Sequence, residues 1–304
     1  MNNQKKIAVH ISTKNRIRDL AFTLNKLQPL LGNKVSCVVF DDGSTDNTFG
    51  YVTDNYPEVS VLRNHESKGY LYCRNKMLNQ TDADFIISLD DDAHFVTSNP
   101  FPTIISYFEE NPGCGVIAMR IYWGDLMPDD ITDDSNPTWV KSFVGCAHAW
   151  RKTAWDAIPD YPEWFGFYGE EDFASYHLYK KGIAVNFVPE ILVQHRVVVR
   201  DRKKQQDYGV RLRRSLRSGW YSILLFYPLT KIPGIMVYSI WIQFKSKIIK
   251  GDITALKAVM LACIDVVVAL PKLLMQSNRF TRKEFNQYQK LAPTKIYWNP
   301  KPQR

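Results

Sequence analysis

The stretch FIISLDDDAHF, residues 85–95, decides how the rest of the chain is interpreted. An apolar run with β-branched residues, which predicts a buried strand, ends in Asp90, Asp91 and Asp92. Three adjacent carboxylates repel one another, so such a cluster needs a positive charge beside it. A divalent cation is the simplest answer, and hard oxygen ligands suit Mg²⁺ or Mn²⁺. A solvated acidic turn is the alternative that the three residues alone leave open.

The segments around this stretch alternate between strand and helix patterns. Short apolar runs predict strands at 6–12, 35–41, 59–63 and 84–90, and helical patterns lie between and after them at 15–27, 69–80 and 101–112. This order predicts a parallel sheet with helices on both faces, in which ligands bind at the carboxyl ends of the strands. We therefore expect Asp41 and Asp42, at the end of one strand, to face the same crevice as residues 90–92.

The second half of the chain predicts a less regular fold. We expect a polar loop, then a strand with a short helix, then an aromatic loop leading into a helix, then two short strands, at 123–137, 141–159, 165–182 and 183–196. Beyond residue 200 the pattern is mostly helical, and charged residues or prolines interrupt each apolar run before it reaches the roughly 20 residues of a membrane span. We thus predict a catalytic domain at 1–200 and a helical region at 201–304.

Charge is distributed unevenly along the chain. Of its 304 residues, those from His195 onward include 22 Lys and Arg against 5 Asp and Glu, whereas residues 1–194 include 17 against 26. A basic region of this kind meets an anionic partner, and we expect a membrane surface rather than a nucleic acid. Aromatic residues would then lie at headgroup level: Trp220, Tyr221, Phe226, Tyr227, Tyr238 and Trp241. A helical bundle or a homodimer interface is the alternative.

The cysteines and the start of the chain bear on location. The five cysteines are scattered without a CxxC pair, which argues against zinc and against a disulfide framework. The sequence does not open with a recognisable signal peptide. We expect a cytoplasmic protein at the inner face of the cell membrane.

Polar clusters at other expected strand ends and helix starts are further site candidates. They are Thr13, Asn15 and Arg16; Asp41, Asp42 and Ser44; Lys68, Gly69 and Arg74; Glu170, Glu171 and Asp172; and His195. Each alone has an ordinary structural interpretation as a turn, a helix cap or a solvated face. A carboxylate at a helix start can also act as a general base, and a neutral imidazole can bind a metal.

Taken in order, these motifs resemble a known family. TKNR, DDGSTD, GYLYCRN, LDDD and GEED, followed by a downstream histidine, resemble the inverting family 2 glycosyltransferases of the bacterial surface-polysaccharide type. The resemblance covers about residues 5–200 and implies the GT-A fold: a Rossmann-like, mixed and mainly parallel sheet flanked by helices. The helical C-terminal extension lies beyond the resemblance.

The resemblance also implies roles for individual residues. Asp172 would be the catalytic base, with Glu171 supporting it or contacting the acceptor. Mn²⁺ or Mg²⁺ would be bound by Asp92 and Asp90, with His195 beside it. The nucleotide-sugar donor would be bound by Thr13, Asn15, Arg16, Asp41, Asp42, Ser44, Lys68, Gly69, Arg74, Asp90 and Asp91.

The implied activity is the transfer of a single sugar from a UDP-, dTDP- or GDP-sugar to a hydroxyl acceptor, such as a lipid-linked glycan. A processive polysaccharide synthase is a close alternative, but its QxxRW motif is absent from residues 205–220. A sugar nucleotidyltransferase would need a glycine-rich basic loop near the N-terminus, and a dinucleotide-binding protein needs GxGxxG after the first strand. ISTKNR contains neither. A binding module without catalytic activity would not require the acidic cluster and a candidate base.

Overall fold

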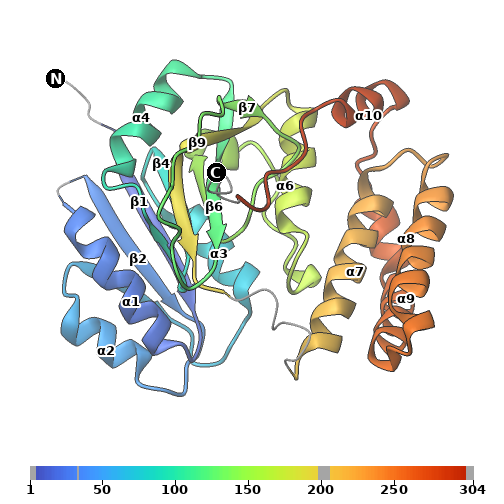
Figure 1. Cartoon of the computed structure of the whole chain (residues 1–304), viewed down its shortest axis with the longest axis horizontal. Helices are drawn as coiled ribbons and strands as arrows, with labels where there is room; N and C mark the ends of the chain where they lie inside the picture. The colour runs from blue at the N-terminus through green and yellow to red at the C-terminus, as the bar shows by residue number, and fades with distance from the viewer. Residues whose placement is uncertain (1–4, 33, 198–205, 299–304) are drawn as a thin grey trace.

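The computed structural model describes residues 5–32, 34–197 and 206–298, and these residues form one mixed sheet between two layers of helices (Figure 1). The nine strands are β1 Ile7–Thr13, β2 Val35–Asp41, β3 Val59–Arg63, β4 Phe85–Asp90, β5 Ala93–Phe95, β6 Cys114–Trp123, β7 Thr138–Trp139, β8 Ala147–Arg151 and β9 Ala184–His195. Their order is β3-β2-β1-β4-β8-β6-β9-β5, with β7 beside β9.

The first half of the sheet is parallel, as the alternation of strands and helices predicts. β1 pairs in parallel with β2 and β4, and β2 pairs in parallel with β3. β8 then runs antiparallel to both β4 and β6. The expected mixed sheet is confirmed. Because β2, β1 and β4 are adjacent and parallel, their carboxyl ends lie at the same edge of the sheet.

Helices cover both faces of the sheet. They are α1 Ile17–Leu27, α2 Thr48–Asn55, α3 Tyr70–Gln80, α4 Pro100–Glu110, α5 Lys152–Trp155, α6 Glu170–Lys180, α7 Tyr208–Phe226, α8 Ile232–Ser246, α9 Ile253–Met275 and α10 Arg282–Gln289, with single 3₁₀ turns at Gln28–Leu30, Glu163–Phe165 and Ile248–Lys250. One core joins α1, α2 and α4 to one face, and a second core joins α3, α6, α7 and α10 to the other. The apolar stripe of α1, with Leu20, Leu24 and Leu27 buried, explains how that helix packs on the sheet.

β9 is one strand where two short strands were expected. Its first half pairs with β6 up to Met119 opposite Val188, and the register then shifts so that Arg120 faces Leu192. The skipped residues include Pro189, which has no N–H to donate to a neighbouring strand. The interruption is therefore a local irregularity, and β9 continues through it to His195.

The C-terminal helices pack against the rest of the fold, where α7 contacts α6. α7 is buried on both sides, and α9 packs on it through Ala255, Ala258 and Ala262. Trp220, Tyr221 and Phe226 are at most 4% exposed, so the expectation that they face a membrane is wrong. Aromatic composition predicts an interface without showing which side of a helix packs inward. The expected domain boundary at residues 200 and 201 lies outside the described residues.

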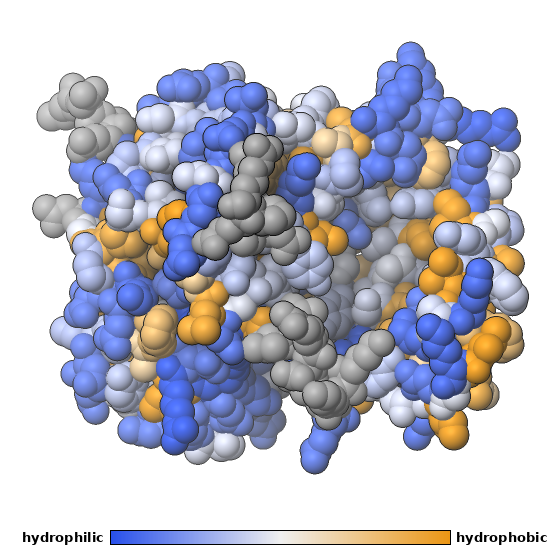
Figure 2. Space-filling view, in the orientation of Figure 1, coloured by the Kyte–Doolittle hydropathy of each residue, from blue (hydrophilic) through white to orange (hydrophobic). Residues whose placement is uncertain are grey.

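The expectation that apolar runs are too short for a membrane span is also wrong for α9. Its 23 residues are long and apolar enough to cross a membrane by length and composition, with only 22% of the apolar window buried. Lys257 and Asp265 interrupt the sequence, but Asp265 pairs with Arg213 of α7 at 2.5 Å, which offsets its charge. Figure 2 shows hydrophobic residues gathering over α8 and α9.

Candidate functional site

The polar segments predicted at strand ends meet at one edge of the sheet. Thr13 ends β1, and its hydroxyl donates to Asp91 just beyond β4 at 2.8 Å. Asp41, at the end of β2, lies opposite Thr13 in the register of the two strands. His195 ends β9 and lies opposite Ala93. Four strands therefore bring these side chains to one edge of the sheet.

Asp90, Asp92 and His195 form the acidic centre of this crevice. One ligand atom from each lies within 4.8 Å of the others, so the three could bind one metal ion. His195 Nε2 is 2.9 Å from Asp92 Oδ1, and the indole ring of Trp123 lies against the imidazole with 4.3 Å between ring centres. Two carboxylates and an imidazole are ligands that suit Mn²⁺. The residues therefore fit a divalent cation.

Arg16 supplies part of the positive charge that the cluster needs. Its guanidinium nitrogens lie 2.7 Å from Asp92 Oδ2 and 3.1 Å from Asp91 Oδ1. Burial raises the pKa of Asp91 to about 7, although Arg16 opposes the shift. The pKa of Asp92 is lowered, because His195 and Arg16 outweigh its burial. The cluster thus combines a strongly acidic Asp92 with an Asp91 that holds a proton more readily.

Asp42 is fully engaged within the protein. It accepts hydrogen bonds from Asn64 and Ser67 side chains and from the backbone N–H groups of Lys68 and Gly69, at 2.6–2.9 Å. These bonds lower its pKa although burial opposes them. A carboxylate has about four acceptor positions, so the main role of Asp42 is to hold the 64–69 loop.

Asp41, Ser44 and Asn15 organise the neighbouring turn. Asp41 is buried, accepts from the Ser44 N–H at 2.8 Å and pairs with Arg63 at 3.3 Å. Asn15 has a left-handed backbone, with φ of 54°, and its N–H donates to the Ser44 hydroxyl at 2.9 Å. Gly43 is required here, since a Cβ at φ of +71° would lie 2.8 Å from the Ser67 nitrogen. The predicted nucleotide residues thus build one continuous wall.

Lys68 and Arg74 have different environments, although the sequence predicts both to line the nucleotide pocket. Lys68 is exposed and lies 4.9 Å from the centre of the Tyr72 ring. The Arg74 side chain is only 4% exposed, and its Nη2 lies 2.9 Å from Asp90 and 2.7 Å from the Gly145 carbonyl oxygen. Tyr70 covers Arg74 at 4.3 Å and donates to Asp90 at 3.0 Å. Arg74 therefore positions Asp90 from behind, and Lys68 is the cation that a ligand can reach.

The three acids at the start of α6 have different surroundings. Glu170 is 3% exposed, and burial raises its pKa to about 7. Glu171 accepts from the Gly145 N–H at 3.1 Å, and its pKa lies well above the ordinary value because of burial and the adjacent Glu170. Asp172 keeps an exposed side chain, although surrounding protein raises its pKa and the Ser142 hydroxyl opposes this. Asp172 is therefore the most exposed of the three acids.

Three residues of the site were missed by sequence reasoning. Tyr70 lies four positions before Arg74 on α3, and this spacing places both on one face of the helix. Trp123 carries no such signal, because β9 brings His195 to it only in the folded protein. Gly145 is close to two site residues: a Cβ there would lie 2.5 Å from Glu171 Oε1 and 3.8 Å from Arg74 Nη1.

Comparison with known proteins identifies the family. The model of glycosyl transferase family 2 matches residues 8–162, half of the chain, including the acidic cluster. The chain belongs to glycosyl transferase family 2. It is a glycosyltransferase with the GT-A fold, as the order of its motifs suggested. No curated protein sequence is similar enough to count as a match.

Solved glycosyltransferases share this fold. GalNAc-T7, solved with UDP, GalNAc and Mn²⁺, is 15% identical with a TM-score of 0.60, over 76% of this chain and 50% of that one. TarS 1–349 from S. aureus is 16% identical with a TM-score of 0.59, over 90% and 83% of the two chains. The mannosyltransferase PcManGT from Pyrobaculum calidifontis, solved with GDP-Man and Mn²⁺, is 13% identical with a TM-score of 0.56, over 95% and 84%. This chain spans only half the length of GalNAc-T7. At these identities the likeness concerns the fold.

Proposed function

We propose that this glycosyltransferase moves a single sugar, with inversion and with a divalent cation, from a nucleotide diphosphate sugar to a hydroxyl acceptor. The observation that carries the proposal is the cluster of Asp90, Asp92 and His195 at the carboxyl edge of the sheet. A diphosphate and a carboxylate cluster repel each other unless a cation lies between them. Bound there, Mn²⁺ or Mg²⁺ would offset the charge that develops on the departing diphosphate.

The donor would lie along the wall formed by the ends of β1 and β2. In this proposal Thr13, Asn15, Asp41, Asp42, Ser44 and Gly69 shape the nucleotide side, Arg16 and Lys68 face the diphosphate, and Arg74 holds Asp90. Arg16 is 42% exposed on its side chain, so it can turn toward a phosphate. The neighbours solved with UDP and with GDP-Man support a donor of this class, with UDP, dTDP and GDP as the candidates.

Asp172 would act as the general base. Its side chain is exposed where an acceptor can approach, whereas Glu171 is tied to Gly145 and supports the start of the helix. A raised pKa favours proton uptake from a hydroxyl, and the surroundings of Asp172 shift its pKa in that direction. The acceptor oxygen then attacks the anomeric carbon as its proton passes to Asp172. The bond to the diphosphate breaks on the opposite side, which inverts the anomeric centre.

The exposed side of α8 and α9 would contact a membrane. Tyr238 and Trp241 are 63% and 52% exposed, and α9 presents a row of exposed apolar residues at Ile253, Leu256, Met260, Ile264, Val267 and Val268. Basic residues accompany this surface at Lys245, Lys250 and Lys257. Apolar area next to lysines favours an anionic lipid surface. The proposal is a peripheral enzyme at the inner face of the cell membrane that acts on a lipid-linked glycan in polysaccharide assembly.

We favour a helix that lies on the membrane over one that spans it. One face of α9 is buried on α7, and Asp265 is paired there with Arg213. A spanning α9 would have to break this packing. A homodimer through the same apolar side is the alternative, and sedimentation of the protein without lipid distinguishes the two.

A transfer assay tests the proposed function directly. The purified chain is incubated with UDP-, dTDP- and GDP-sugars, Mn²⁺ and a membrane lipid extract, and the product linkage is read by NMR. The expected result is one added sugar with inverted anomeric configuration. A product with retained configuration, or a polymer of many sugars from one encounter, would contradict the proposal.

A further inference from the structure

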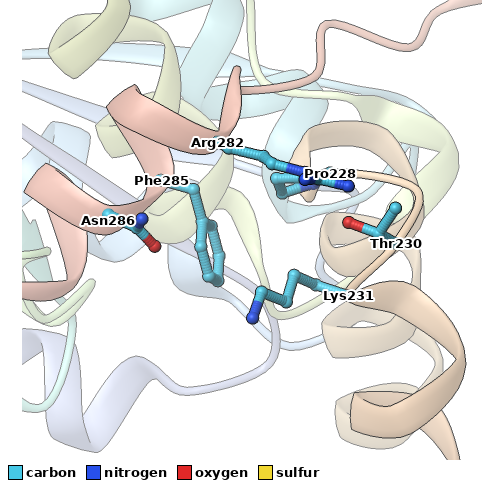
Figure 3. Close-up of a pocket in the computed structure, with 6 residues that line it drawn as sticks. All are labelled: Pro228, Thr230, Lys231, Arg282, Phe285 and Asn286. Carbon is cyan, nitrogen blue, oxygen red and sulfur yellow. The ribbon is translucent and has the colours of Figure 1, made fainter.

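A separate pocket lies between the α7–α8 turn and the start of α10, away from the donor crevice. It encloses about 340 Å³ and is lined by Pro228, Thr230, Lys231, Arg282, Phe285 and Asn286. Figure 3 shows side chains from the turn and from α10 facing each other across this space. The volume lies in the range of small-ligand sites.

The pocket is positively charged. Lys231 and Arg282 come from segments that are far apart in the sequence, and among the described residues neither forms an ion pair with a carboxylate. The nearest acid on α10, Glu284, instead accepts from the Thr281 N–H at 2.7 Å and lies 3.9 Å from Lys180. Thr230 and Asn286 add a hydroxyl and an amide to the lining.

Both helices begin at the pocket. α8 starts directly after Lys231, and α10 starts at Arg282. Helix starts carry partial positive charge. At α10 the Glu284 N–H already donates to the Thr281 hydroxyl in a capping box, and Pro233 in the first turn of α8 has no N–H, so the helix starts contribute mainly through their charge. Two cations and two polar side chains beside these helix starts give the pocket a lining that suits a phosphate group, since charged hydrogen bonds to phosphate oxygens are strong.

The apolar residues beside the pocket favour a phosphate group that is attached to a lipid. Leu229, in the turn beside the pocket, is 65% exposed, and Val237, farther along α8, is 68% exposed. A soluble anion gains nothing from these apolar groups. A phosphate that carries a hydrocarbon chain could place its charge in the pocket and its chain along this surface.

The pocket is also connected to the start of the catalytic helix. The Phe285 ring packs on Tyr227 with 4.8 Å between ring centres, and the Tyr227 hydroxyl lies 3.3 Å from that of Tyr176. Tyr176 is one helical turn after Asp172 on α6, so both lie on the same side of that helix. Two aromatic rings therefore separate the pocket from the face of α6 that carries the proposed base.

We propose that this pocket binds the phosphate or diphosphate group of the lipid-linked acceptor at the membrane surface. Lys231 and Arg282 hold the phosphate oxygens, and the glycan extends toward the α6 side of the molecule. This inference rests on the proposed function, because it gives the acceptor of the same reaction a binding site.

Vesicle binding by the full chain tests the inference. Vesicles of phosphatidylcholine receive either a polyprenyl diphosphate or phosphatidylglycerol, matched in negative charge, and co-sedimentation gives the affinity. We expect the polyprenyl diphosphate to bind at least about tenfold tighter. The double variant Lys231→Gln/Arg282→Gln should lose this preference, whereas Lys290→Gln/Lys295→Gln, which removes the same charge from exposed positions at and beyond the end of α10, should keep it.

Several results would overturn the inference. They are equal binding to both kinds of vesicle, an unchanged preference in the pocket variant, or the same loss in the control variant. The affinity for inorganic diphosphate is measured by calorimetry as a further test. If it equals the affinity for the polyprenyl diphosphate vesicles, the pocket is a site for soluble anions. Donor binding with Mn²⁺ is measured in parallel and should not change in the pocket variant. If wild-type protein takes up no donor, the proposed function fails while the vesicle result stands by itself.

Discussion

Replacing Glu170 by glutamine should change how the stability of the protein depends on pH. Glu170 is buried, and its pKa of about 7 lies above the ordinary 4.5. Between these two values the folded protein keeps a proton that the unfolded chain has released, so the free energy of unfolding falls as pH rises. The difference between the two pKa values corresponds to about 3 kcal/mol of unfolding free energy, and the protein has lost all of it above pH 7. Glutamine cannot ionise and avoids this loss.

Urea unfolding at pH 5 and pH 8 measures the effect. The Glu170→Gln variant should be about 3 kcal/mol more stable than wild type at pH 8 and within about 1 kcal/mol of it at pH 5. Glu109→Gln, which changes an exposed glutamate on α4, should match wild type at both. An equal change at both pH values would show that ionisation of Glu170 does not destabilise the folded protein.

Three further predictions concern the support of the site. Arg74→Met removes the buried partner of Asp90 and should lower the free energy of unfolding by about 3 kcal/mol in urea; a loss below about 1 kcal/mol would show that Asp90 does not depend on it. Gly145→Ala places a Cβ against Glu171 and should lower kcat at least about tenfold with donor binding unchanged; wild-type kcat would contradict this. Asp172→Asn should bind donor normally in calorimetry but lose transfer by about 10²–10⁴-fold, and wild-type turnover would remove Asp172 as the base.

The sequence predicts the donor edge of the fold well because its signals are local. The apolar run 85–89 leads straight into the acids, and the same pattern recurs at β1 and β2, so hydrophobic periodicity places Asp41 and Asp90 at strand ends. Family membership then follows from the order of the motifs. The pattern cannot show which carboxylates already accept hydrogen bonds from other parts of the protein. The four donors to Asp42 come from residues 64–69, and the loop that carries them is positioned only in the folded protein.

In the C-terminal half, by contrast, the sequence does not predict which side chains are buried. Trp220 and Trp241 are both aromatic residues in basic, apolar helices, yet one is 1% exposed and the other 52%. The difference arises because α7 lies between α6 and α9, and composition carries no information about which helices become neighbours. For the same reason the pairing of Asp265 with Arg213 could not be predicted from the sequence.

The most direct test of the central claim is calorimetric titration of the purified chain with UDP-, dTDP- and GDP-sugars, with Mn²⁺ and with the ion removed by chelator. One of these donors should bind only when Mn²⁺ is present, and Asp92→Asn should weaken this binding strongly while the variant stays folded. Equal donor binding with and without the ion, unchanged in Asp92→Asn, would contradict the assignment of Asp90, Asp92 and His195 as the site of a metal that holds the donor.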